Sequence, residues 1–277
     1  MMPSPAMASS DTAGGEPPQT PRDRPADVPH AEFLGLRFAL LTQRRALLAI
    51  LEQTGAPYRY VVTPNAYHVV AAHDDPARLL PIYRAAWLSL CDSRIIRALA
   101  RLERHALPLV TGSDLVAALF AALNRDRVAS APKRILVVGP SRGTEAALRA
   151  GYPKLDFEVL PAPTGLAQSP ELRLAVARAC INRPWDIALL CVGCPAQELI
   201  ARELGELGCK SGIALCVGAS IDFLTGARAR APLWLQKLGL EWAYRLIREP
   251  ARLWRRYLVY SPKILRIFIA ERVPRGR

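Results

Sequence analysis

The chain has 277 residues, of which 51% are hydrophobic, so it can bury one sizeable core and an appended subdomain. Its formal net charge of +13 favours anionic partners: nucleic acid, phosphorylated small molecules or an acidic membrane surface. No apolar stretch approaches the roughly 20 residues of a membrane-spanning helix, and residues 1–30 lack the apolar centre of a signal peptide. We therefore expect a soluble or peripheral protein.

The first part of the chain predicts a tail followed by alternating strands and helices. Residues 1–30 are rich in Pro and small polar residues, which is typical of a disordered tail. Residues 33–40 form a short apolar run, and residues 58–62 are β-branched and aromatic like a strand. Helical spacing is expected over residues 44–53, before Thr54 and Gly55, and over residues 64–73.

The next part gives the clearest fold signal. Four continuous apolar runs are bounded by Gly, Pro or charged residues, at 134–139, 157–160, 185–193 and 212–218. Helical segments are expected near residues 143–150, 170–181 and 197–207. Fully apolar strands that alternate with helices indicate an α/β fold with a parallel sheet covered on both faces. Ligands of such sheets bind at the carboxyl ends of the strands, so the loops of interest begin at Thr63, Gly139, Gly193 and Gly218.

Residues 227–277 differ from the α/β core at 31–226. Thirteen Lys or Arg side chains are opposed by three Glu, which leaves a net charge of +10 in this segment. Pro232 is expected to start a helix whose apolar residues run to Leu246, and Pro250 and Pro262 divide the rest of the segment into short helical pieces. Arginines interleaved with Leu, Trp and Tyr are typical of a helix that lies on an anionic bilayer. We predict a basic amphipathic appendage that associates with a membrane.

Two polar loops allow both a structural and a functional interpretation. Thr63-Pro64-Asn65 follows a predicted strand and opens a helix, where backbone N–H groups bind phosphate or sugar hydroxyls; alternatively, Thr63 is an ordinary helix N-cap. The loop of Thr111, Gly112, Ser113 and Asp114 has the same two interpretations, and its small residues suit close approach of a ligand.

Asp92 is the candidate catalytic base. It lies beside Arg94 in otherwise apolar surroundings, and partial burial of this kind brings the pKa of a carboxyl towards the working pH. The structural alternatives are an ion pair with Arg94 or a cap on the helix that begins near Ser93.

The loops after the later strands suit a nucleotide. In residues 193–198, Gln197 is placed to read an amide edge and Glu198 to bind ribose hydroxyls. In residues 218–226, Asp222 is placed to bind a ribose or base, or to cap a turn. The Gly139 loop lacks the spacing of a dinucleotide or P-loop motif.

No metal site is expected. The four histidines have no metal-ligand spacing, the Cys191-x-x-Cys194 pair has no second pair at zinc spacing, and Asp-x-Asp is absent. The six cysteines are interpreted mainly as small core residues of a reducing compartment. A leaving diphosphate would then need arginines to neutralise it.

Together these motifs resemble the WecG/TagA/CpsF glycosyltransferase family. The strongest matches are GCPAQE at residues 193–198, VGASIDFLTG at 217–226 and RAPLWLQKLGLEWAYRLIREPARLWRRYL at 230–258. The Thr63–Asn65 and Thr111–Asp114 motifs add the expected N-terminal features, and the resemblance spans residues 33–258.

The resemblance implies a Rossmann-like core that transfers a sugar from a UDP-sugar to a polyprenyl-diphosphate-linked saccharide, with inversion and without a metal or other cofactor. It places Thr63 and Asn65 in the active-site pocket and makes Asp92 the base. Gln197 and Asp222 would help to form the donor site. Appendage arginines, foremost Arg230, Arg245 and Arg252, would neutralise the diphosphate at the cytoplasmic face of a bacterial membrane.

One departure from the family leaves alternatives open. The family usually has Asp-Gly-x-Gly at the base, whereas Asp92 is followed by Ser93, Arg94 and Ile95, which suggests an exopolysaccharide branch with another acceptor. An inactive scaffold of a polysaccharide assembly complex remains an alternative. A nucleic-acid-binding protein is less favoured, because Trp and Leu are interleaved with the arginines. Apolar surface on the appendage also leaves a homo-oligomer open.

Overall fold

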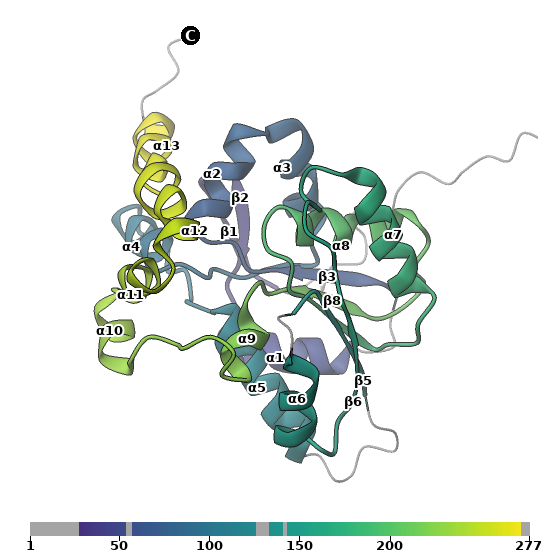
Figure 1. The fold of residues 1–277 in the computed structure, drawn as a ribbon. Helices are drawn as coiled ribbons and strands as arrows, with labels where there is room; N and C mark the ends of the chain where they lie inside the picture. Colours follow the sequence, from purple (N-terminus) through teal and green to yellow (C-terminus); the bar gives the residue numbers. More distant parts are fainter. Residues whose placement is uncertain (1–27, 54–56, 126–132, 141–142, 273–277) are drawn as a thin grey trace, which may run out of the picture.

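The computed structural model describes residues 28–53, 57–125, 133–140 and 143–272. Its core is a six-stranded sheet with the order β4-β3-β8-β7-β5-β6, in which every pair of neighbours is parallel (Figure 1). The strands are β3 (Arg59–Val62), β4 (Leu88–Ser89), β5 (Arg134–Val138), β6 (Asp156–Leu160), β7 (Ile187–Leu190) and β8 (Ile213–Cys216). Together with the helices on both faces, this confirms the predicted α/β, Rossmann-like fold.

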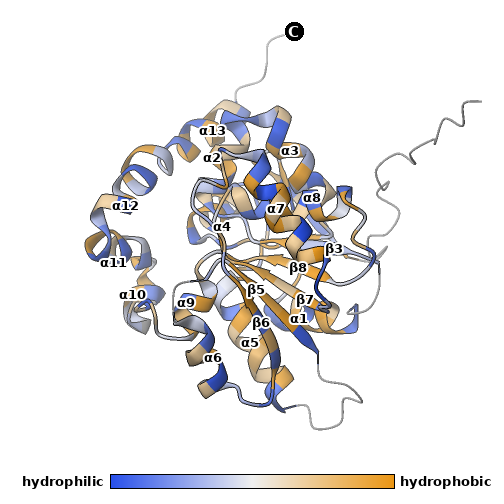
Figure 2. Cartoon of the chain, turned by 45° about the vertical axis from the view of Figure 1, so that its right-hand side comes forward, coloured by the Kyte–Doolittle hydropathy of each residue, from blue (hydrophilic) through white to orange (hydrophobic). Residues whose placement is uncertain are grey.

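Nine helices in the described part of the core flank or border the sheet: α1 (Gln43–Glu52), α2 (Ala66–Asp74), α3 (Pro76–Ala85), α4 (Arg94–Leu102), α5 (Gly112–Arg125), α6 (Thr144–Gly151), α7 (Pro170–Ile181), α8 (Ala196–Glu206) and α9 (Ser220–Leu224). Alternate strand residues point to opposite faces. In β5, Leu136 and Val138 therefore join the cluster with α2, α3, α7 and α8, whereas Ile135 and Val137 join the cluster with α1, α5 and α6. Because both faces are covered, the central strands β7 and β8 are apolar throughout (Figure 2), whereas the edge strand β6 carries exposed Asp156 and Glu158.

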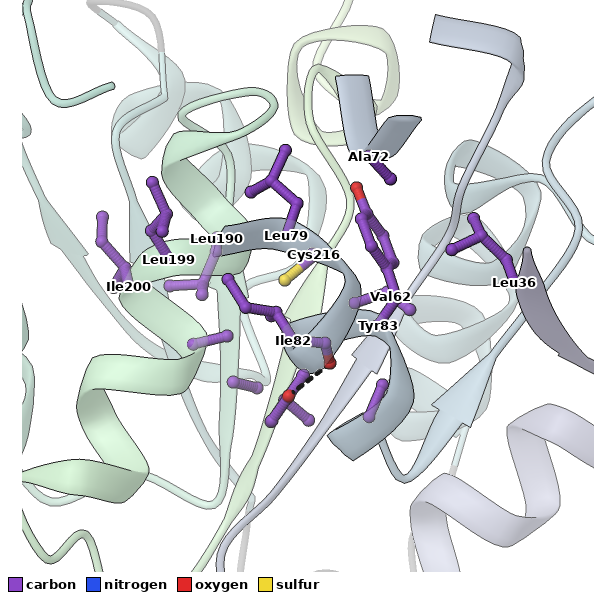
Figure 3. Packing of buried hydrophobic residues seen from close by; sticks show 14 of the residues in the cluster. Leu36, Val62, Ala72, Leu79, Ile82, Tyr83, Leu190, Leu199, Ile200 and Cys216 are labelled. Carbon is purple, nitrogen blue, oxygen red and sulfur yellow. Dashed lines mark hydrogen bonds between the residues drawn. The ribbon is translucent and has the colours of Figure 1, made fainter. Parts of the chain in front are cut away.

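The packing around α3 holds the carboxyl ends of β3 and β8 in place. Figure 3 shows Ile82 and Tyr83 of α3 beside Val62 and Cys216, which are the last residues of these strands and are register partners. The Tyr60 hydroxyl donates a hydrogen bond of 2.6 Å to the Ile82 carbonyl. A buried hydroxyl with a partner fixes α3 to the sheet without a desolvation penalty.

The N-terminal segment differs from its prediction. The apolar run at residues 33–40 does not form a single strand. Instead, β1 (His30–Phe33) and β2 (Leu36–Ala39) form an antiparallel hairpin. The turn has positive φ at both central residues, Leu34 (52°) and Gly35 (69°), as tight hairpins require. The hairpin begins at His30 inside the range predicted as a tail, and residues 1–27 of that range lie outside the described residues, as do Thr54 and Gly55.

The appendage is a chain of short helices: α10 (Leu233–Leu238), α11 (Glu241–Arg248), α12 (Pro250–Trp254), the π-helical η2 (Arg255–Tyr260) and α13 (Lys263–Arg272). The single helix predicted from Pro232 to Leu246 is wrong, because Gly239 ends α10 in the left-handed conformation (φ 76°). Pro250 starts α12 and Pro262 precedes α13, as predicted. The appendage curves along one side of the core (Figure 1), and α13 packs back onto α2 and β1. Within the described residues, each helix is too short or too polar to cross a bilayer.

Candidate active site

A cavity of about 570 Å³ lies where the carboxyl ends of the sheet face the appendage. Loops after β3, β4, β7 and β8 form one part of its wall, and α11, η2 and the start of α13 form another. This is where open parallel sheets bind their ligands. The cavity is therefore the candidate active site.

The structure brings most of the predicted site residues to this cavity: Thr63, Asn65, Asp92, Thr111, Ser113, Asp114, Gly193, Gln197, Gly218, Arg230 and Arg245. Five others do not line it: Gly112, Gly139, Glu198, Asp222 and Arg252. Local contacts account for each of these positions.

Asp92 lies between β4 and α4, half-buried at the cavity wall. Ser93, not Asp92, caps α4, since its hydroxyl accepts from the Ile96 N–H at 3.2 Å. The Gly112 N–H donates to Asp92 Oδ2 at 3.4 Å, and among the described residues no ion pair joins Asp92 to Arg94. Both structural alternatives for Asp92 are thus wrong.

The pKa of Asp92 is raised to about 7, mainly by burial and also by the negative charge of Glu241. The hydrogen bond from Gly112 and the charges of Arg245 and Arg256 act in the opposite direction. A carboxyl with a pKa near neutrality is half ionised at physiological pH. It is therefore suited to take a proton from a substrate hydroxyl.

The Thr63-Pro64-Asn65 turn places two polar groups at the carboxyl end of β3. Thr63 is not the N-cap, because its hydroxyl donates to the Cys216 carbonyl at 2.9 Å and ties β3 to β8. Asn65 caps α2 instead: its Oδ1 accepts from the Tyr67 N–H at 3.1 Å. The N-terminus of α2 therefore faces the cavity, where its dipole favours an anionic ligand.

The Thr111 loop caps α5 and also anchors the appendage. The Thr111 hydroxyl accepts from the Asp114 N–H at 3.1 Å and donates to Asp114 Oδ2 at 2.7 Å. Arg230 forms an ion pair with the same carboxylate at 2.8 Å. A Cβ on Gly112 would lie 3.2 Å from Ser220 Oγ and 3.3 Å from Thr63 Oγ1, so Gly112 is a packing position behind the cavity.

Gln197 joins the loops that follow β7 and β8. Its Oε1 accepts from the Gly218 N–H at 2.9 Å, and its Nε2 donates to Glu198 Oε1 at 2.8 Å. Glu198 is 0% exposed and lies behind Gln197 rather than in the cavity wall. Asp222 is likewise engaged with protein, since Arg228 Nε lies 3.1 Å from its Oδ2.

Gly139 and Arg252 also have structural roles. A Cβ on Gly139, whose φ is 74°, would lie 2.2 Å from Val192 Cγ1, so only glycine allows this approach of two loops. Ser141 and Arg142 of the same loop lie outside the described residues. Arg252 pairs with Glu249 at 2.5 Å.

Arg256 lines the cavity although it was not among the site residues that the sequence predicted. Its guanidinium lies over the Tyr67 ring (4.8 Å to the centroid), and Nη2 is 3.5 Å from Asn65 Oδ1. Arg245 lies over Phe223 in the same cavity, at 5.3 Å. Arg256 belongs to the π-helical η2, where the 3.6-residue period fails, so helical spacing gave no sign that it would face the cavity.

A cluster of potential metal ligands also meets at the cavity. A ring nitrogen of His68, Cys194 Sγ and a carboxylate oxygen of Glu198 all lie within 4.8 Å of one another. His68 belongs to α2, whereas the other two belong to the segment that follows β7. The spacing within the sequence therefore did not predict this grouping.

Comparison with known families agrees with the fold. The family model described as "Glycosyl transferase WecG/TagA/CpsF family" matches residues 31–277. The match begins within β1 and continues through the whole appendage, so it includes every segment that contributes to the cavity. The chain therefore belongs to the WecG/TagA/CpsF family and is a glycosyltransferase.

Proposed function

We propose that this glycosyltransferase moves a sugar, with inversion, from a UDP-sugar to a polyprenyl-diphosphate-linked saccharide in bacterial exopolysaccharide or cell-surface glycan synthesis. The observation that carries the proposal is one cavity that holds both a carboxyl of pKa about 7, Asp92, and the guanidinium groups of Arg245 and Arg256. A base for an acceptor hydroxyl and cations for a leaving diphosphate are what this reaction needs.

The donor half of the proposal rests on the loops and the arginines. Gly193 and Gly218 expose backbone at the carboxyl ends of β7 and β8, beside the Gln197 amide, which suits a nucleotide. The Arg245 and Arg256 guanidiniums neutralise charge on the departing UDP, so the reaction needs no divalent ion on the diphosphate.

The acceptor half rests on Asp92. Its carboxylate takes the proton of the acceptor hydroxyl while that oxygen forms a bond to the anomeric carbon. The bond between this carbon and the UDP oxygen breaks on the opposite side, and UDP leaves with the bonding electrons. General-base help of this kind contributes roughly 10²–10⁴-fold to the rate. A single displacement inverts the configuration at the anomeric carbon.

The appendage supports a membrane-bound acceptor at the cytoplasmic face. Large apolar side chains are exposed along it, including Trp234, Leu238 and Ile247, the last 80% exposed, among many basic residues. Apolar surface rimmed by Lys and Arg suits an anionic bilayer. Leu258 and Leu265 are exposed and also line the cavity, which makes an apolar path for a polyprenyl chain.

A panel of UDP-sugars tests this function. Each is incubated with the protein and a short-chain polyprenyl-diphosphate saccharide, with and without EDTA, and UDP release is measured. We expect acceptor-dependent release with one donor, and the same release when EDTA is present. A folded, vesicle-bound protein that releases UDP from no donor with any acceptor offered would favour the inactive scaffold instead.

A further inference from the structure

The cavity wall contains an acid and an indole ring that the proposed transfer does not use. Glu241 and Trp242 are consecutive residues at the start of α11, and both line the cavity. Glu241 is half-buried, whereas 38% of Trp242 is exposed. Neither side chain belongs to the groups proposed to bind the nucleotide or the diphosphate, so the start of α11 offers the cavity a separate set of contacts.

The Glu241 carboxylate is not paired with the arginines around it. Arg245 follows it by one helical turn on α11 and lines the same cavity, a spacing at which acidic and basic side chains commonly pair. Among the described side chains, however, no ion pair joins Glu241 to Arg245 or to the other arginines of the cavity wall. Arg245 Nε is buried and also has no hydrogen-bond partner among the described residues. Glu241 can therefore accept hydrogen bonds from a ligand.

The start of α11 lies on the Asp92 side of the cavity. A Cβ on Gly239, two residues before Glu241, would lie 3.5 Å from Arg94 Cδ at the start of α4. Asp92 precedes the same helix, and it is close enough for the charge of Glu241 to raise its pKa. Because β4 is at the edge of the sheet and β3 separates it from β8 and β7, this side is apart from the loops proposed to bind the nucleotide.

A carboxylate beside an aromatic face is suited to a sugar rather than to a phosphate. An ionised carboxyl only accepts hydrogen bonds, so it needs donors such as sugar hydroxyls, whereas it repels the charge of a phosphate. The face of an indole ring carries partial negative charge, so the C–H bonds on one side of a sugar ring pack against it favourably. The Tyr257 ring, whose centroid is 6.1 Å from that of Trp242, supports the indole from within the same wall.

We infer that Glu241 and Trp242 bind the acceptor saccharide and hold its reactive hydroxyl at Asp92. The inference rests on the proposed function, because it takes the acceptor to present a sugar to this base. Glu241 accepts hydrogen bonds from hydroxyls that do not react, and the indole ring packs against one face of the sugar. The first turn of α11 then contacts the saccharide, whereas Arg245 in its second turn contacts the diphosphate of the donor.

Binding of lipid-linked sugars to the full chain tests the inference without relying on turnover. Farnesyl diphosphate, either bare or with glucose or N-acetylglucosamine attached, is titrated calorimetrically into the protein with UDP present, and UDP is titrated separately. We expect at least one glycosylated compound to bind roughly tenfold or more tightly than bare farnesyl diphosphate, which is what one hydrogen bond to a charged group can contribute.

Variants of the two residues should lose this preference for the sugar. Glu241→Ala and Trp242→Ala should each remove most of it and leave the affinities for UDP and for bare farnesyl diphosphate unchanged, whereas Trp242→Phe keeps an aromatic face and should keep most of the preference. Glu271→Ala and Trp254→Ala are the matched controls, because both side chains are exposed on the appendage and do not line the cavity. Both controls should bind the glycosylated compound as the wild type does.

Circular dichroism establishes that each variant is folded, and Glu241→Gln replaces the alanine variant if that one is not. The inference is overturned if the wild type binds neither glycosylated compound more tightly than bare farnesyl diphosphate, or if the preference survives in both alanine variants. A loss of UDP affinity in place of the sugar preference would also overturn it, because the residues would then belong to the donor site. A sugar preference that depends on both residues, in a protein that transfers no sugar, would count against the proposed function alone.

Discussion

At the residue scale, the proposed chemistry depends on the surroundings of Asp92. Its carboxyl is buried enough to raise its pKa to about 7, yet Arg245 and Arg256 are near enough to favour the charged form. A fully paired aspartate would have a low pKa and would be a weak base, whereas an unpaired, deeply buried one would stay protonated. The balance leaves a base that ionises near physiological pH.

This balance predicts the pH dependence of the transfer. The active form needs Asp92 deprotonated, so kcat/KM should fall about tenfold for each pH unit below about 7 and level off above it. Initial rates from pH 5 to 9, with the donor that the UDP-sugar panel identifies, measure this profile. A rate that stays constant down to pH 5 would contradict a base with a raised pKa.

The second residue-scale prediction compares the effects on kcat/KM of substituting two adjacent arginines, Arg255 and Arg256. Arg256 lines the cavity, whereas Arg255 lies over the Trp254 ring and is not part of the cavity lining. Arg256→Gln should lower kcat/KM by roughly 10²–10³-fold, because it removes a donor to the developing negative charge. Arg255→Gln, which removes the same charge one residue away, should change kcat/KM less than threefold on a soluble acceptor. Equal losses in the two variants would argue for a general charge effect instead.

At the element scale, the sequence predicted the middle of the sheet well. Strands β5, β7 and β8 are buried on both faces, so their uninterrupted apolar runs were distinctive. The two-residue strand β4 has too few residues to show a pattern, although it positions Asp92. Helical spacing continues across Gly239, so only the left-handed backbone of this glycine reveals the break between α10 and α11.

The candidate site was predictable only in part, for a similar reason. The loop after a predicted strand pointed to Thr63 and Asn65, whereas Asp92 was singled out by its apolar surroundings and by the family resemblance; the structure brings all three to the cavity. Residues of the appendage reach the cavity through tertiary packing and a π-helical segment. Neither leaves a periodic signal in the sequence, so Arg256 was missed and Arg252 was preferred.

The element-scale prediction concerns the contribution of the buried ion pair between α7 and α8 to the free energy of unfolding. Arg173 Nε and Glu203 Oε1 lie 2.8 Å apart, and each side chain is only 7% exposed. Glu203→Ala should lower the free energy of unfolding by about 3–5 kcal/mol, because it leaves the guanidinium buried without its partner. Glu145→Ala breaks the exposed pair with Arg149 on α6 and should cost less than about 1 kcal/mol. Urea denaturation measures both, and similar losses would contradict this assignment.

At the scale of the whole molecule, the appendage (residues 227–277) contributes both to the cavity and to the proposed membrane surface. It supplies part of the cavity wall and also presents exposed apolar and basic side chains. Arg230 anchors its start to Asp114 of α5, and α13 anchors its end to α2. This arrangement keeps the proposed membrane surface and the catalytic cavity together.

Vesicle binding should therefore depend on the appendage and not on the core. Ile247→Ser removes an exposed apolar side chain whose burial contributes about 1.5–3 kcal/mol, so it should weaken co-sedimentation with anionic vesicles about tenfold or more. Leu48→Ser changes an exposed leucine of α1 in the core and should leave vesicle binding unchanged. Binding to duplex DNA but not to vesicles would instead indicate a nucleic-acid partner.

The most direct test of the account is the transfer rate of Asp92→Asn, measured together with its affinity for UDP. The substitution keeps the size of the side chain but removes the proton acceptor, so UDP binding should be unchanged while kcat falls roughly 10²–10⁴-fold. The variant must be folded by circular dichroism for the comparison to count. Transfer at the wild-type rate by a folded Asp92→Asn protein would contradict the assignment of Asp92 as the base.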